Sequence, residues 1–182
     1  MKVIGVVGLP ASGKGEFSKI AAALKVPDVV MGDMIRRAVQ KEGLDPTDEN
    51  LGLVANRLRA EQGMDAIARL CVPEIQRQTG PLVLVDGIRG DAEVALFRKT
   101  FPDFILVSID SSFENRLSRV AARGRSDDFK TAEELHNRDE RELRWGLGTA
   151  LEQSDVHVKN NGTLDEFSVA VHELLDEIRN DS

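Results

Sequence analysis

The sequence contains a single cysteine, Cys71, and no hydrophobic run long enough to cross a membrane. One cysteine excludes a disulfide within the chain and a zinc site built on cysteines. Because Cys71 stands in the apolar stretch ARLCVPEI, we expect a small core residue there. A membrane-spanning helix needs about 20 apolar residues in succession, and none are present. The first residues lead straight into a strand-like pattern without an export signal, so we expect a cytoplasmic protein with no membrane partner.

Basic residues are outnumbered: 24 lysines and arginines stand against 31 acidic residues, giving a net charge of −7. This balance argues against a protein that holds duplex nucleic acid by neutralising its phosphates. The segment 116–125 nevertheless contains four arginines and no acidic residue. A local arginine cluster on an acidic protein suits a small phosphorylated ligand better than a long polyanion. The cluster consists of Arg116, Arg119, Arg123 and Arg125.

The chain of 182 residues suits one domain with a single core. Short apolar runs rich in β-branched residues alternate with helical patterns, which is typical of a parallel sheet with helices on both faces. We therefore predict a three-layer α/β fold with five parallel strands, at 2–7, 28–31, 81–86, 103–110 and 155–160. The predicted helices cover 14–25, 33–43, 48–62, 64–78, 91–100, 112–122, 131–150 and 164–179. Since three of these helices fall in 31–80, more than one crossover requires, this segment is expected to form a flap or substrate subdomain.

The stretch GLPASGKGEF stands between the first predicted strand and the first predicted helix. Its glycines and lysine have the spacing of a phosphate-binding loop, but Gly15 replaces the Ser or Thr that usually follows the lysine. Glycines let backbone N–H groups converge on an anion, the lysine reaches the terminal phosphates, and the following helix offers its N-terminus. The alternative is a glycine-rich turn with an exposed lysine. The predicted nucleotide-binding residues are Gly8, Leu9, Pro10, Ala11, Ser12, Gly13, Lys14, Gly15 and Glu16.

This loop resembles that of nucleoside monophosphate kinases of the adenylate kinase type, which commonly read Gly-x-Pro-x-x-Gly-Lys-Gly-Thr. The resemblance implies a P-loop NTPase fold, ATP as co-substrate, and Mg²⁺ held largely through water. It also accounts for Gly15, whereas Glu16 departs from the pattern because the family usually has Thr there, near the α-phosphate. One interpretation of Glu16 is a helix-start residue that points aside and gains about 0.3–1 kcal/mol from the helix dipole. The other is a contact with magnesium-bound water or with the second substrate.

Two further stretches resemble the acceptor side of these kinases. The stretch MGDMIRRAV is similar to the family's Gly-Asp-Met-Leu-Arg, which implies that Arg36 binds the acceptor phosphate and that Asp33 is a site residue. The stretch VLVDGIRG is similar to Asp-Gly-Phe-Pro-Arg, which implies that Asp86 holds magnesium through water and that Arg89 is a second acceptor-phosphate ligand. Taken alone, Arg36 would be a surface residue of a helix and Asp86 a turn residue at a strand end. Because Met31 replaces the family's Thr, the acceptor base is expected to be recognised differently.

The arginine cluster resembles the short lid of UMP/CMP kinases, which read Gly-Arg-Ser-Asp-Asp where this chain has GRSDD. The resemblance implies a lid over 119–138, with Arg119 above the donor base. The alternative is a solvated helix face. The stretch SDVHVKNNGTLDEF also resembles dephospho-CoA kinase, whose Asn-Asn-Gly turn borders the donor adenine, and the chain as a whole is similar to an archaeal group of adenylate-kinase-like proteins. The catalytic residues that the resemblance implies are Lys14, Arg123, Arg125 and Arg138.

Phosphoryl transfer asks the protein mainly for positioning and charge neutralisation. The predicted function is therefore ATP-dependent phosphoryl transfer to a nucleoside monophosphate or a similar small phosphorylated acceptor. Mg²⁺ is the predicted cofactor, and small-molecule nucleotides are the predicted partners, with no prediction of oligomeric state. One alternative is a dephospho-CoA kinase, which phosphorylates a hydroxyl and would use Asp33 as a base. Another is a nucleotide-dependent switch that hydrolyses ATP slowly and acts on a partner.

Overall fold

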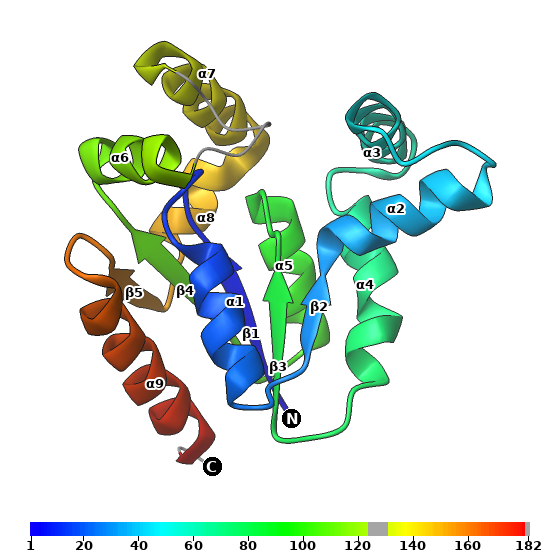
Figure 1. Cartoon of the computed structure of the whole chain (residues 1–182). Coiled ribbons are helices and arrows are strands. Elements are labelled where there is room, and N and C mark those ends of the chain that lie inside the picture. Colours follow the sequence, from blue (N-terminus) through cyan, green and yellow to red (C-terminus); the bar gives the residue numbers. More distant parts are fainter. Residues whose placement is uncertain (124–130, 181–182) are drawn as a thin grey trace.

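A computed structural model describes residues 1–123 and 131–180. Five parallel strands form one sheet in the order β2-β3-β1-β4-β5 (Figure 1). The predicted α/β fold with five parallel strands is thus confirmed. Because β1 lies between β3 and β4, the loop that follows it opens where the strand order reverses, which is where open α/β sheets bind ligands. The strands are β1 (Lys2–Val7), β2 (Asp28–Val30), β3 (Leu82–Asp86), β4 (Phe104–Asp110) and β5 (Val156–Lys159).

Helices cover both faces of this sheet (Figure 1). They are α1 (Lys14–Ala23), α2 (Met31–Lys41), α3 (Asp48–Gln62), α4 (Ala66–Gln76), α5 (Asp91–Thr100), α6 (Phe113–Arg123), α7 (Ala132–Glu142), α8 (Gly148–Glu152) and α9 (Leu164–Asn180). On one face α1 and α9 bury Phe17 and Phe167, and on the other α4 and α5 bury Ile67 and Phe97. Over residues 1–123 and 131–180, no helix has both the length and the apolar character needed to cross a membrane.

The three central strands, β3, β1 and β4, are buried on both sides of the sheet, and they are apolar at almost every position for that reason. Within β1, Val3 and Val7 enter the core beneath α4 and α5, while Ile4 and Val6 enter the core beneath α1 and α9. Cys71 of α4 is fully buried in the first of these cores, and burial raises the pKa of its thiol to about 12. It is therefore a core residue, as the sequence predicted.

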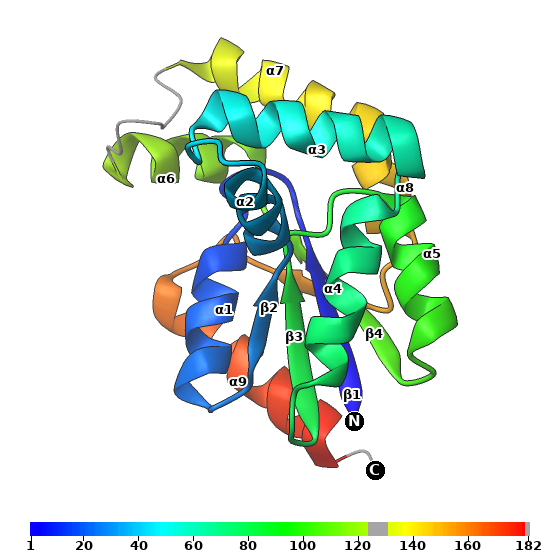
Figure 2. The same ribbon diagram turned by 90° about the vertical axis from the view of Figure 1, so that its right-hand side faces the viewer.

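The segment between β2 and β3 contains three helices, at the predicted positions. Thr47 caps the start of α3, and its hydroxyl accepts a hydrogen bond of 3.2 Å from the N–H of Asn50. α4 packs into the core through Ala68 and Ile75, whereas α3 lies beyond the carboxyl ends of the strands (Figure 2). The segment therefore starts and ends in the core and extends over the edge of the sheet where the strands end.

The single helix predicted over 131–150 is wrong, because the chain breaks within it. After Glu142 at the end of α7, a π-helical turn spans Leu143–Leu147 before α8 begins. Gly146 has a φ of 93°, a left-handed conformation that favours glycine. A side chain on Gly146 would also collide with the carboxylate of Asp91, in the first turn of α5. The break thus lets this segment approach the start of α5 more closely than a continuous helix with side chains would allow.

Candidate functional site

A cavity of about 680 Å³ opens at the carboxyl ends of β1 and β3. This volume suits a small-molecule ligand. Leu9 does not line it but packs against the core, and Asp33 lies outside its lining. Arg125 and the side chain of Arg123 lie outside the described residues. The predicted site residues that line the cavity are Gly8, Pro10, Ala11, Ser12, Gly13, Lys14, Gly15, Glu16, Arg36, Asp86, Arg89, Arg119 and Arg138.

The phosphate loop is a tight turn closed by a hydrogen bond of 3.1 Å from the N–H of Ser12 to the carbonyl of Leu9. Gly13 has a φ of 118°, which a residue with a side chain rarely adopts. Lys14 reaches back across the turn, and its ammonium group donates to the carbonyls of Gly8 and, at 3.1 Å, of Leu9. The loop therefore places a cation at the N-terminus of α1, where backbone N–H groups already favour an anion.

The lysine of this loop is electrostatically perturbed. Burial lowers the pKa of Lys14 from its ordinary value of 10.5 to about 8. Nearby charges act in both directions: Glu142 and Asp86 raise this pKa, while Arg89 and Arg138 lower it. All five side chains line the same cavity. An anion bound among them would stabilise the charged lysine, so the site is suited to phosphate groups.

Two arginines of α6 fasten the phosphate loop to the rest of the fold. Arg116 is buried, donates to the carbonyl of Pro10 at 3.1 Å, and forms a bidentate ion pair with Asp139 of α7 at 2.8 and 2.6 Å. Arg119 donates to two carbonyls of the loop and to the side-chain oxygen of Asn160 at 3.0 Å. Asn160 in turn donates to a loop carbonyl at 2.8 Å. Arg116 is thus a structural member of the cluster, and a contact of Arg119 with a donor base stays a prediction.

The two arginines predicted for the acceptor phosphate line the same cavity as the phosphate loop. Arg36 pairs with Asp33 in the first turns of α2, and both side chains are about half exposed. Arg89, in the loop after β3, is held at both ends. Its backbone N–H donates to Glu93 at 2.7 Å, and its guanidinium lies 3.3 Å from a carboxylate oxygen of Glu142. The structure therefore brings cations from two separate segments to face the loop.

Asp86 is the carboxylate expected to face magnesium. It ends β3, lines the cavity, and lies close enough to Lys14 to raise the pKa of that residue. Within the described residues, no group of three or more His, Cys, Asp or Glu side chains is arranged to hold a metal ion. A single carboxylate fits Mg²⁺, which is commonly bound by one or two carboxylates, water and the phosphates of a substrate. Asp86 would accordingly hold Mg²⁺ together with a nucleotide.

The two residues after the lysine, Gly15 and Glu16, are unusual for different reasons. The carboxylate of Glu16 lies 2.6 Å from the ammonium of Lys19, one turn further along α1. This orientation favours the interpretation of Glu16 as a helix-start residue. A side chain built on Gly15 would meet no described atom within 4 Å. Crowding within the described protein therefore does not explain the missing hydroxyl at Gly15.

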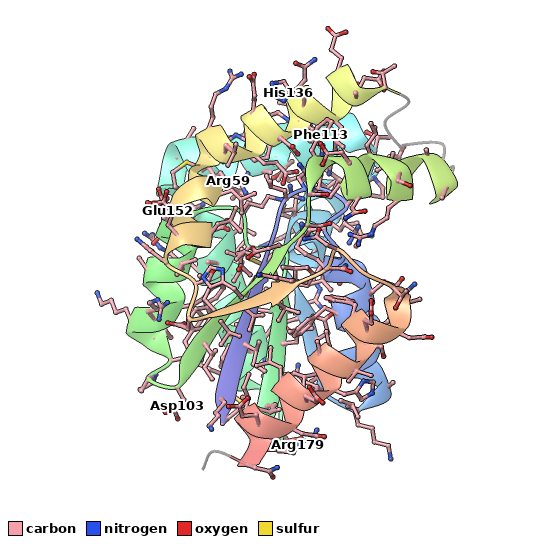
Figure 3. All side chains as sticks on the ribbon, turned by 90° about the vertical axis from the view of Figure 1, so that its left-hand side faces the viewer. Arg59, Asp103, Phe113, His136, Glu152 and Arg179 are labelled. Atoms are coloured by element: carbon pink, nitrogen blue, oxygen red, sulfur yellow. The ribbon has the colours of Figure 1, made fainter. Side chains whose placement is uncertain are left out.

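The cavity residues that the sequence did not predict include Glu142 and Arg59. Glu142 is 5% exposed and accepts a hydrogen bond of 3.0 Å from Arg138, so the i,i+4 spacing of the two in a helical pattern was the available signal. Arg59 of α3 lies 3.5 Å from Glu93 of α5 and 5.8 Å from the ring centre of Trp145. Figure 3 shows Arg59 where α3 passes behind α7 and the turn that follows it. No local sequence pattern predicts the contacts of Arg59, because they join segments far apart in the sequence.

Comparison with known proteins agrees with this geometry. A family model described as an AAA domain matches residues 4–144. The chain is 63% identical over 175 residues to a UPF0200 protein of Methanoregula boonei, which covers 96% of each chain. It is 60% identical over 175 residues to a UPF0200 protein of Methanoculleus marisnigri, again covering 96% of each. Among solved structures, TT1252 from Thermus thermophilus has a TM-score of 0.66 and 20% identity over 97% of each chain, a likeness that concerns the fold alone.

The residues matched by the family model include the phosphate loop, the end of β3, and both α6 and α7. These segments supply much of the cavity lining, whereas Asn160, Gly162 and Leu164 of that lining lie outside the matched residues. A P-loop domain of this kind implies a nucleotide as ligand. The chain belongs to the UPF0200 family and contains an AAA domain of the P-loop type.

Proposed function

We propose that this UPF0200 protein transfers the terminal phosphoryl group of ATP to a nucleoside monophosphate or a similar small phosphorylated acceptor. The observation that carries the proposal is the meeting of Lys14 with arginines from three other segments in one cavity. These are Arg36 from α2, Arg89 from the loop after β3, and Arg138 from α7. The phosphate loop and its lysine suffice to bind a nucleotide. A further set of cations on the β2–α2 and β3–α5 sides supports a second phosphorylated substrate.

The cations would divide the charge of the two substrates between them. Lys14 would neutralise the terminal phosphates of ATP, and Mg²⁺ held through water by Asp86 would share that task. Arg36 and Arg89 would hold the acceptor phosphate. One of its oxygens would attack the γ-phosphorus of ATP while the bond to the bridging oxygen breaks and ADP leaves. Since that acceptor oxygen is already ionised near neutral pH, the transfer requires no general base.

We assign the acceptor side to the segment 31–80 and a lid to the segment 119–138. The described parts of this lid are the end of α6 and most of α7, which the buried pair of Arg116 and Asp139 joins. Arg138 lines the cavity from α7, where it would face the transferring group. Arg123 and Arg125 would complete the set, as the sequence resemblance implies.

A hydroxyl acceptor, as in dephospho-CoA kinase, is less well supported. It would need a base, and Asp33 was the candidate. In the structure Asp33 pairs with Arg36 and lies outside the cavity lining. A base must lie within hydrogen-bond reach of the hydroxyl that it deprotonates, and a carboxylate outside the cavity lining is not so placed. The arrangement therefore favours an acceptor that is already ionised.

The test is a panel of acceptors with ATP or GTP and Mg²⁺, followed by separation of products by anion-exchange chromatography. The panel contains the four common nucleoside monophosphates, dephospho-CoA and a reaction without acceptor. We expect a diphosphate product from at least one monophosphate, and its loss in Lys14→Ala. Slow ATP hydrolysis that no acceptor accelerates would instead support the nucleotide-dependent switch, and phosphorylation of dephospho-CoA alone would support the hydroxyl acceptor.

A further inference from the structure

A single buried carboxylate joins two arginines of the candidate site. Glu142 is the last residue of α7 and is 5% exposed. Its Oε1 atom accepts from Nε of Arg138 at 3.0 Å and lies 3.3 Å from Nη1 of Arg89. Arg138 lies one turn earlier in α7, whereas Arg89 belongs to the loop after β3, 53 positions away from Glu142. Glu142 therefore ties the helix of the proposed lid to the acceptor side of the cavity.

This carboxylate also lies at the phosphate end of the cavity. Glu142, Arg89 and Arg138 line the cavity together with Lys14. After the effect of burial, the charge of Glu142 has the largest influence on the pKa of Lys14, and it favours the charged lysine. A carboxylate in this place would repel a bound phosphate, so it opposes the ligand that the surrounding cations favour.

Stability alone explains this arrangement poorly. The carboxylate loses its water on burial, and pairing with arginines whose side chains are 41% and 34% exposed commonly offsets little more than that loss. Two guanidinium groups brought to one point also repel each other unless an anion lies between them. A buried carboxylate that accepts from both arginines fixes their directions without any bound ligand. Such an arrangement suits a site in which both arginines must face the same phosphoryl group.

We propose that Glu142 is a positioning residue for phosphoryl transfer, which holds Arg89 and Arg138 together beside Lys14 at the expense of nucleotide affinity. The part that concerns transfer rests on the proposed function, whereas the part that concerns affinity requires nucleotide binding only. Two consequences have opposite signs. Removal of the negative charge should tighten the binding of phosphate groups, and a loss of the link between the arginines should slow transfer.

Two substitutions separate the charge from the geometry. Glu142→Gln keeps the length and an oxygen that accepts hydrogen bonds but removes the charge. We expect it to bind ATP and inorganic triphosphate roughly three- to tenfold more tightly, and AMP less so, because the effect grows with the charge of the ligand. Glu142→Asp keeps the charge but shortens the side chain, so its ATP affinity should stay within about threefold while its link to the arginines is lost. Turnover should fall roughly tenfold or more in Glu142→Asp, and the KM for the acceptor should rise with it, because Arg89 is proposed to hold the acceptor phosphate. Glu142→Gln, which keeps an accepting oxygen between the arginines, should lose much less turnover.

The matched control is Glu140→Gln, on the same helix, where the carboxylate is exposed and pairs with Arg144 at 3.4 Å. Affinities are measured by calorimetry with EDTA present, so that they report on the protein alone, and thermal unfolding checks that each variant is folded. Weaker binding of ATP, triphosphate and AMP alike in Glu142→Gln would show a merely structural role and overturn the proposal, as would a Glu140→Gln variant that behaves in the same way. The affinity measurements stand even if no acceptor is phosphorylated, so a failure of the kinase proposal is distinguishable from a failure of this one.

Discussion

Nucleotide binding by this protein should weaken as the pH rises above about 8, a lower pH than for a site whose lysine has an ordinary pKa. Burial lowers the pKa of Lys14 to about 8, and a bound polyphosphate would raise it again by stabilising the ammonium group. The complex then holds more protons than the protein and nucleotide apart, so affinity must fall as pH rises. The fall begins near the pKa of the unliganded protein and reaches about tenfold per pH unit until the pKa of the complex is passed.

The size of the effect follows from the fraction of charged lysine. At pH 9 about a tenth of Lys14 would remain charged without nucleotide, whereas an ordinary lysine would remain almost fully charged. We therefore expect ATP to bind about tenfold more weakly at pH 9 than at pH 7.5. Calorimetry at constant ionic strength, with EDTA present, measures this dependence. Buffers of different ionisation enthalpy should also reveal the uptake of a proton on binding.

The control is Lys14→Arg, because a guanidinium group does not lose its proton in this range. Its affinity will differ from that of the natural protein, since its geometry differs, but its dependence on pH should be nearly flat between pH 7.5 and 9.5. A flat profile for the natural protein would refute the assignment of a lowered pKa to Lys14. The same slope in both proteins would trace the effect to another group.

Further predictions concern the acceptor arginine, the transferring group, the loop and the fold. Arg36→Ala should raise the acceptor KM by roughly tenfold or more with ATP affinity little changed. Arg138→Ala should instead lower kcat by up to ~10³-fold. Steady-state assays of both variants measure these effects. Equal losses of ATP affinity in the two would contradict this division. Glu16→Thr should tighten ATP binding modestly and leave kcat intact, since the glutamate turns to its neighbour in α1; a loss of turnover above about tenfold, or ~1.4 kcal/mol of barrier, would place it in the reaction instead. Asp139→Ala should lower the free energy of unfolding by about 3–5 kcal/mol in urea titrations, because its arginine partner stays buried and unpaired. Glu140→Ala, which removes an exposed partner, should cost less than about 1 kcal/mol, and equal losses would argue against a special role for the buried pair.

The parts of the fold that the sequence predicts well are those encoded within a few neighbouring residues. Every strand of the sheet was predicted to within about two residues, because each contains a short run of β-branched residues bounded by turns. Thr131 and Thr163 cap the helices that follow them, and each stands three residues before a glutamate, a spacing typical of a capping box. The phosphate loop is similarly local, since all of its conformational requirements lie between Gly8 and Gly15. Gly146 shows the limit of prediction from neighbouring residues. Its left-handed conformation accompanies a close contact with the start of α5, more than fifty residues earlier.

The charge of the site could not be obtained from the sequence, because counting cations does not show which of them the fold has already neutralised. The segment 116–125 suggested four arginines for a ligand, yet Arg116 forms a bidentate pair with Asp139, 23 positions later. Arg119 likewise donates to the backbone of the phosphate loop. On the acceptor side the positive charge is reduced by a residue that the sequence did not predict. Glu142 adds a buried negative charge between Arg89 and Arg138, which local patterns do not connect. The cations that can bind a phosphate are thus those that are not already paired with carboxylates or carbonyls of the protein. For that reason the affinity of the site should respond as strongly to the carboxylate of Glu142 as to any one of the arginines.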